Sequence, residues 1–134
     1  MTAILTFDDG RRLQRSTQAM TGMYALVAEA MPTGSTRLKR WLADVSQRGA
    51  PFADFALAGL DAQDRAAFWT AARAAWRVLE QRSEPGFLDD PHAHTANCLA
   101  ELVAMRDDPT RGPRDETLAR QPARPIDLDD RWFD

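Results

Sequence analysis

The side chains with the greatest potential for chemistry lie in one short stretch. They are Asp89, Asp90, His92, His94 and Cys98, and all three residue types can bind a divalent metal. His94 and Cys98 are four residues apart and would share one face of a helix. His92 and His94 are two apart, so on a helix they would point about 200° away from each other. Because no distant Cys/His pair completes a zinc site, we expect neither a metal nor a cofactor, and a small metal- or ligand-binding helical protein is kept as an alternative.

Cys98 is the only cysteine, which excludes an internal disulfide. A catalytic thiol needs a neighbouring base and a lowered pKa. Cys98 instead shares an apolar stripe with Leu99 and Leu102, so we expect a buried thiol in the core. The adjacent acids Asp8 and Asp9 precede a glycine and indicate a turn. Phosphate-binding glycine loops and the motifs of zinc proteases and serine hydrolases are absent, so we expect that the protein is not an enzyme.

Charge is distributed unevenly along the chain. The net charge is −3, but residues 11–48 carry seven basic and two acidic side chains, whereas residues 84–134 carry twelve acids and six arginines. Opposite charges of this kind attract each other within a monomer, between subunits or toward different partners. The overall acidity disfavours nucleic acid as a partner. We therefore expect Arg37, Lys39 and Arg40 to form a solvated helix face above a buried Trp41.

The last ten residues, PIDLDDRWFD, alternate apolar and aromatic side chains with carboxylates. Burying the four apolar side chains would contribute roughly 6–12 kcal/mol, and ordering the segment would cost about 13 kcal/mol. Docking on its own domain is therefore near break-even, and this segment either clamps the fold or binds a partner. Aromatic anchors with carboxylates around them favour a positively charged protein surface. The predicted partner-binding residues are Asp127, Asp129, Asp130, Trp132 and Phe133, with Asp89, Asp90, Asp107 and Asp108 as a second acidic patch.

The apolar spacing predicts a mainly helical scaffold for these side chains. Residues 2–7 favour a strand, residues 8–10 a turn, and residues 11–13 a short returning strand. Predicted helices run from Ser16 or Thr17 to about Met31, from Ser35 to Gly49, from Asp61 to Arg82 and from Asp90 or Pro91 to about Arg106. Residues 51–60 indicate a helical turn or an ordered loop. We expect the helices to pack around the alanine-rich segment 61–82.

These elements predict a small helical bundle with an N-terminal β-hairpin at residues 1–106. A proline-rich, acidic and extended arm follows at residues 107–134. No apolar run approaches the roughly 20 residues of a membrane span, and the N-terminus lacks the pattern of a secretory signal. We therefore expect a cytoplasmic protein with no membrane partner.

In its size, acidity and lack of catalytic motifs, the whole chain resembles the bacterial immunity proteins of contact-dependent or polymorphic toxin systems. The resemblance is one of general character and not of a motif. It implies a non-enzymatic inhibitor that covers a cognate, basic, nuclease-type toxin with carboxylates that mimic phosphates. The charge distribution leaves a second interpretation open, a homo-oligomeric regulator or adaptor in which the acidic arm of one subunit binds residues 11–48 of another.

Overall fold

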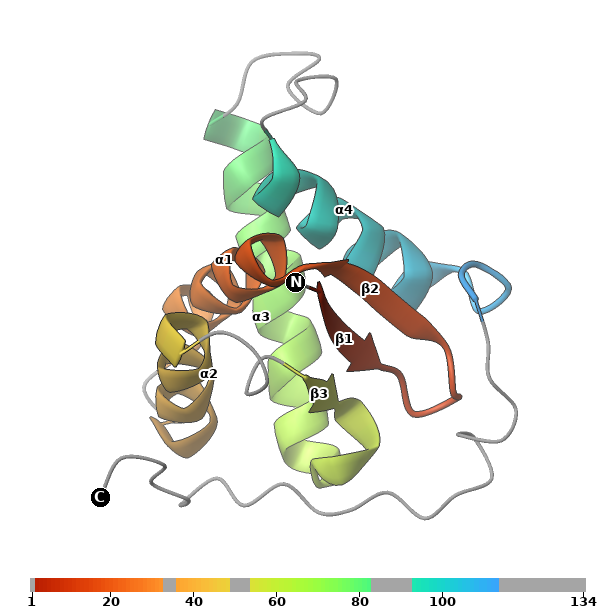
Figure 1. Ribbon diagram of the computed structural model, residues 1–134. Helices are drawn as coiled ribbons and strands as arrows, with labels where there is room; N and C mark the ends of the chain where they lie inside the picture. Colours follow the sequence, from red (N-terminus) through yellow and green to blue (C-terminus); the bar gives the residue numbers. More distant parts are fainter. Residues whose placement is uncertain (1, 33–35, 49–53, 83–92, 114–134) are drawn as a thin grey trace.

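The structure, a computed structural model, describes residues 2–32, 36–48, 54–82 and 93–113. It confirms a mainly α-helical fold with an N-terminal hairpin (Figure 1). The elements are β1 (Thr2–Thr6), β2 (Arg12–Ser16), α1 (Thr17–Ala30), α2 (Thr36–Arg48), β3 (Phe55–Ala56), the 3-10 turn η2 (Leu57–Gly59), α3 (Ala62–Arg82) and α4 (His94–Asp107). No helix within these ranges combines the length and apolar character needed to cross a bilayer.

The hairpin is closed by the predicted Asp-Gly turn. The amide of Phe7 donates to the carbonyl of Arg11 at 2.7 Å, and the amide of Gly10 donates to the carbonyl of Phe7 at 3.0 Å. Gly10 has a φ of 89°, which a side chain would strain. The returning strand is longer than the predicted residues 11–13, because its pairing with β1 continues until Ser16 lies opposite Thr2.

A third strand, β3, pairs parallel to β1, so the sheet order is β2-β1-β3. The sequence indicated only a turn or an ordered loop here. The strand is fixed by long-range contacts, since the ring of Phe55 lies between 5.2 and 5.9 Å from the rings of Trp41, Phe68 and Tyr24. In addition, Oδ1 of Asp54 accepts a hydrogen bond of 2.9 Å from the amide of Ile4. A ten-residue segment cannot reveal such partners.

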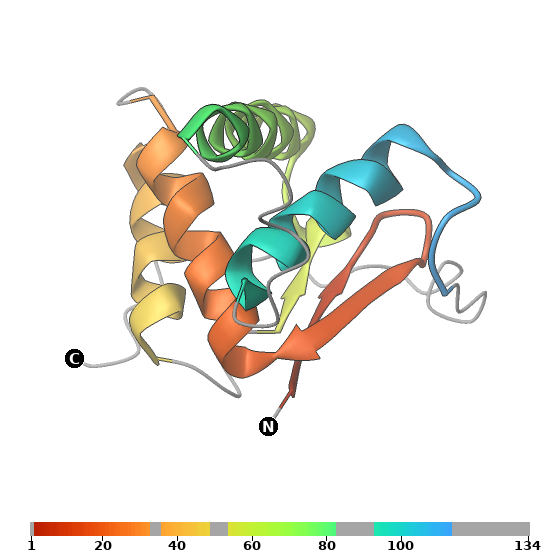
Figure 2. The same cartoon turned by 90° about the horizontal axis from the view of Figure 1, so that it is seen from above.

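The helix at the centre of the fold is α1, and the prediction that residues 61–82 occupy this place is wrong. α1 contacts α2, α3, α4 and both strands of the hairpin (Figures 1 and 2). It buries several of its sides, through Ala19, Met20, Met23, Tyr24, Val27 and Ala28. In α3, by contrast, the buried residues Phe68, Ala71, Ala72 and Ala75 form one stripe. The alanines of α3 therefore bring one face of a flanking helix close to its neighbours.

Two helix starts follow the predicted capping. The Oγ of Ser16 accepts a hydrogen bond of 3.2 Å from the amide of Ala19 and caps α1. The Oδ1 of Asp61 accepts one of 2.8 Å from the amide of Asp64 and caps α3. In both cases the side chain satisfies an amide that has no partner within the helix. Ser35, the predicted cap of α2, lies outside the described residues.

The start of α4 differs from the prediction. The helix begins at His94 with Ala93 as its N-cap and no side-chain cap, instead of at Asp90 or Pro91. Its buried positions begin at Ala96. Since most helical stability in proteins comes from packing of the apolar face, the favourable capping residues upstream do not set the boundary.

The segment after α4 returns to the hairpin. α4 ends at Asp107, one residue beyond the predicted end. The amide of Arg12 then donates to the carbonyl of Pro113 at 3.0 Å. Residues 107–113 are thus attached to the hairpin, whereas residues 114–134 lie outside the described part of the chain. The extended arm and the domain boundary at residue 107 stay predictions.

Candidate binding surface

Most of the residues predicted to bind a partner lie outside the described ranges. This applies to Asp89, Asp90, Asp127, Asp129, Asp130, Trp132 and Phe133, and to His92 of the metal alternative. Their role stays a prediction. The structure places the remaining two, Asp107 and Asp108, at the C-terminal end of α4, where both are exposed.

Both of these carboxylates have partners within the protein. Asp107 forms an ion pair with Arg73 of α3, and this hydrogen bond lowers the pKa of Asp107. The Oδ1 of Asp108 accepts hydrogen bonds from the amide and the hydroxyl of Thr110, at 3.0 and 2.7 Å, and its pKa is lowered as a result. Both groups are therefore held ionised, and Arg73 offsets part of the negative potential that the sequence predicts here.

A buried arginine attaches the hairpin to the end of α4. Arg11 is 5% exposed, although the charge distribution grouped it with the other basic residues of 11–48. Its Nη1 donates to the carbonyl oxygens of Met105, Asp108 and Arg111 at 2.6, 2.7 and 2.9 Å, and its Nε donates to Asp9 at 2.7 Å. A cation at a helix C-terminus also interacts favourably with the helix dipole. Arg11 thereby positions the C-terminal end of α4 beside the hairpin turn.

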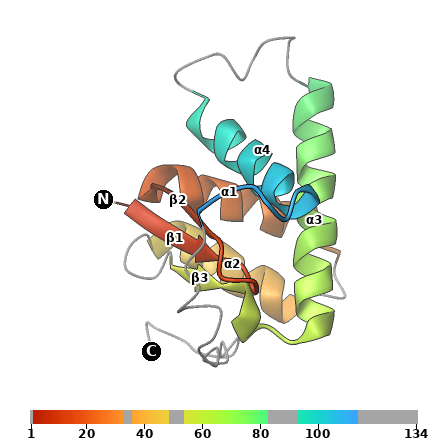
Figure 3. The ribbon, with the colours of Figure 1, turned by 90° about the vertical axis from the view of Figure 1, so that its right-hand side faces the viewer.

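Two hollows lie beside this junction, between α3 and the end of α4. Figure 3 shows the end of α4 lying against α3. The first, of about 540 Å³, lies between the hairpin turn, the first half of α3 and the end of α4. The second, of about 420 Å³, continues along α3 toward Arg77. They share one wall, made of Trp69, Arg106 and Asp107. Together they form one elongated surface.

Arginine and tryptophan dominate this surface. We call Arg65, Trp69, Arg73 and Arg77 of α3, with Arg106 of α4, the arginine face. The guanidinium carbon of Arg106 lies 5.5 Å from the centroid of the Trp69 ring. Nη1 of Arg65 lies 3.5 Å from a carboxylate oxygen of Asp8. The sequence shows the regular four-residue spacing on α3, but not that α4 brings Arg106 onto Trp69.

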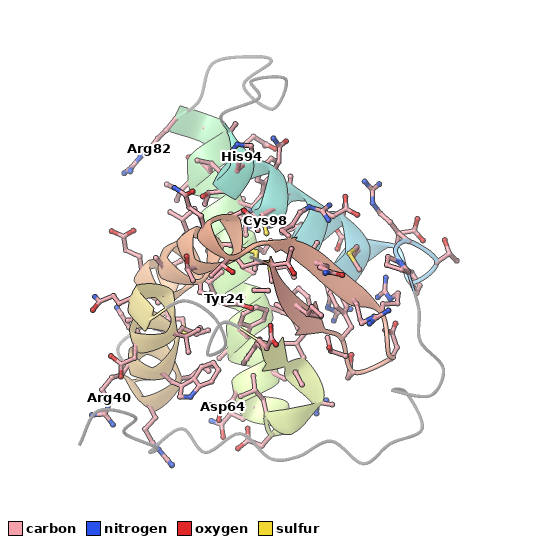
Figure 4. All side chains as sticks on the ribbon, viewed as in Figure 1. Tyr24, Arg40, Asp64, Arg82, His94 and Cys98 are labelled. Atoms are coloured by element: carbon pink, nitrogen blue, oxygen red, sulfur yellow. The ribbon has the colours of Figure 1, made fainter. Side chains whose placement is uncertain are left out.

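Cys98 lies in the core, as predicted. Its side chain is fully buried, and its Sγ lies 3.4 Å from Sδ of Met20 and 3.5 Å from Sδ of Met23. Burial raises the pKa of the thiol to about 12, which disfavours the nucleophilic thiolate at neutral pH. His94 is exposed at the start of α4, so the two side chains do not converge (Figure 4). Among the described residues, no group of three His, Cys, Asp or Glu side chains could hold a metal.

The basic stretch of α2 also has the predicted orientation. Leu38, Trp41 and Leu42 are buried, while Arg37 and Arg40 are exposed and Lys39 is half-buried. Figure 4 shows Arg40 on the outer side of α2. Arg11 is buried and is not part of a basic surface, and Arg37 and Arg40 lie on a different element from the arginines of β2.

Comparisons of the chain with protein families, with curated proteins and with solved structures found no match. A functional proposal therefore rests on the residues themselves.

Proposed function

We propose that the protein is a non-enzymatic binding protein whose ligand is another protein. The arginine face is the observation that supports this proposal best. Arginine and tryptophan are the residue types most enriched among binding hot spots, and here Arg106 lies over Trp69 between two adjoining hollows. The rings of Phe7 and Phe68 lie 5.4 and 5.3 Å from Trp69 and support it from behind. A rigid aromatic anchor of this kind loses little entropy on binding.

Within this class, we favour an inhibitor of the immunity type that neutralises a cognate basic toxin. The charge distribution supports this choice. The described ranges contain 13 basic and 11 acidic residues, whereas residues 83–92 and 114–134 contain nine acids and four arginines. The net negative charge of the chain thus originates outside the described helices and strands. Carboxylates concentrated in this way would steer association toward a basic protein.

Capture from cells that naturally produce the protein tests this proposal. The tagged full chain should recover a basic protein, and its addition should suppress the activity of that protein. Asp129→Lys should abolish the recovery by reversing a charge in the predicted contact. Glu80→Lys, at an exposed position of α3, is the matched control and should leave recovery unchanged. Recovery of no basic protein, or equal recovery by both variants, would contradict the proposal.

A further inference from the structure

The arginine face forms a regular stripe along α3. Arg65, Trp69, Arg73 and Arg77 follow one another at intervals of four residues. Each interval corresponds to a rise of about 6 Å and a rotation of about 40°, so the stripe winds slowly round the helix over about 18 Å. The two hollows extend along the same stretch. The cationic groups of α3 lie about 12 Å apart from Arg65 to Arg73 and about 6 Å apart from Arg73 to Arg77, and Arg106 of α4 adds a cationic group over Trp69 between them.

Trp69 lies in the middle of this stripe, and its ring is fixed by its neighbours. Its ring is packed against Phe7 and Phe68, and Arg106 lies over it. Stacking on an aromatic ring fixes the plane of a guanidinium while its N–H groups stay available at the edge. Arg106 is exposed, so this edge is accessible to a ligand. A carboxylate is the group that such an edge binds with two parallel hydrogen bonds.

The two arginines that have described carboxylate partners can still bind a ligand. Arg65 pairs with Asp8, and Arg73 pairs with Asp107. A guanidinium has five N–H donors, and one carboxylate uses only part of them. The Arg73 pair is exposed on both sides, and solvent weakens such pairs. The internal carboxylates orient the arginines without occupying all their donors.

We propose that the arginine face is a docking surface for an acidic segment of another protein, with carboxylates spaced by about 6 Å. A nucleic acid fits the face less well, because bases bind single-strand sites by stacking on open aromatic rings and Arg106 already lies over the ring of Trp69.

This inference rests on the arginine face, which also supports the proposed protein-binding function, but it differs from the proposed toxin contact in its residues and in the charge of its partner. The experiments can distinguish the two proposals. Loss of toxin binding in an Asp129 variant and loss of acidic-peptide binding in an Arg106 variant are separate results, and either one can be observed without the other.

Fluorescence anisotropy with labelled poly-L-glutamate tests the docking surface on the full chain. Arg77→Gln and Arg106→Gln should each weaken binding by about three- to tenfold, which corresponds to roughly 0.7–1.4 kcal/mol. Arg37→Gln and Arg40→Gln remove the same charge from exposed positions of α2 and are the matched controls. They should change binding less than twofold. Circular dichroism melting curves should show that all four variants are folded.

Three results would overturn the inference. The first is an absence of poly-L-glutamate binding to the unmodified chain. The second is equal weakening by the α2 and α3 variants, which would mean that only net charge matters. The third is tighter binding of an oligothymidylate of matched charge, which would assign the face to nucleic acid. Sedimentation of the chain alone adds a check, since self-association lost on deletion of residues 124–134 would assign the face to a second copy and contradict the proposal.

Discussion

Nη1 of Arg11 donates a 2.6 Å hydrogen bond to the carbonyl oxygen of Met105, 94 residues further along the chain. The bond joins the hairpin turn to the last turn of α4. An isolated hairpin is marginally stable in water, and the carbonyls at the end of a helix lack partners within the helix. Arg11 attaches the hairpin to the rest of the fold and donates hydrogen bonds to these carbonyls. It also forms part of the wall of the first hollow.

Arg11→Met should therefore lower the free energy of unfolding by about 3 kcal/mol, since each buried acceptor left without a donor costs about 1–3 kcal/mol. Arg15→Met changes the same residue type at an exposed position of β2 and should stay within about 0.5 kcal/mol of the original chain. Urea denaturation measures both values. Equal midpoints for the two variants would contradict the structural role of Arg11.

Gly22 of α1 should couple energetically to Thr95 of α4. A Cβ added at Gly22 would lie 2.5 Å from the Thr95 hydroxyl oxygen. Gly22→Ala should therefore destabilise the fold, because overpacking costs about 1–3 kcal/mol and exceeds the gain of about 1 kcal/mol from helix propensity. In a Thr95→Ala background the same change should become neutral or stabilising. A double-mutant cycle with no coupling would show that α1 and α4 do not approach each other in this way.

The buried thiol of Cys98 gives a prediction for alkaline pH. Its pKa is raised by burial to about 12 in the folded protein, from an ordinary value near 9. Between these values the unfolded chain loses a proton that the folded chain keeps, so stability falls as pH rises. The contribution reaches at most about 1.4 kcal/mol per pH unit and should be absent in Cys98→Ala.

Urea denaturation as a function of pH measures this difference between the two chains. In the same range Tyr24 also destabilises the fold in both chains, because burial raises its pKa well above the usual value. The thiol should react with a disulfide reagent at about pH 8 only after unfolding. Rapid modification of the native protein would show that Cys98 is accessible.

The sequence predicted the features that depend on neighbouring residues. The spacing of Leu38 and Trp41 determined which face of α2 is buried, and the capping residues Ser16 and Asp61 set the starts of α1 and α3. Such signals act within one or two helical turns. They are therefore visible without knowledge of the fold.

Features that depend on distant partners were not predictable. Arg11 is buried because carbonyls about 100 residues away accept its hydrogen bonds. Every residue has a backbone carbonyl, so the sequence does not indicate which ones accept these bonds. Phe55 belongs to a strand because three rings from other elements surround it. For the candidate site, the arginine spacing on α3 could be read directly, but the contact between Trp69 and Arg106 required the fold.

Calorimetric titration of the captured basic partner into the full chain tests the central claim most directly. The account predicts a dissociation constant that rises with salt, because opposite charges are screened. It also predicts affinity weakened by at least about tenfold in both Asp129→Lys and Trp132→Ala, which corresponds to about 1.4 kcal/mol. A dissociation constant that is the same in all three chains and insensitive to salt would contradict the claim that the acidic, aromatic C-terminal residues recognise a basic protein.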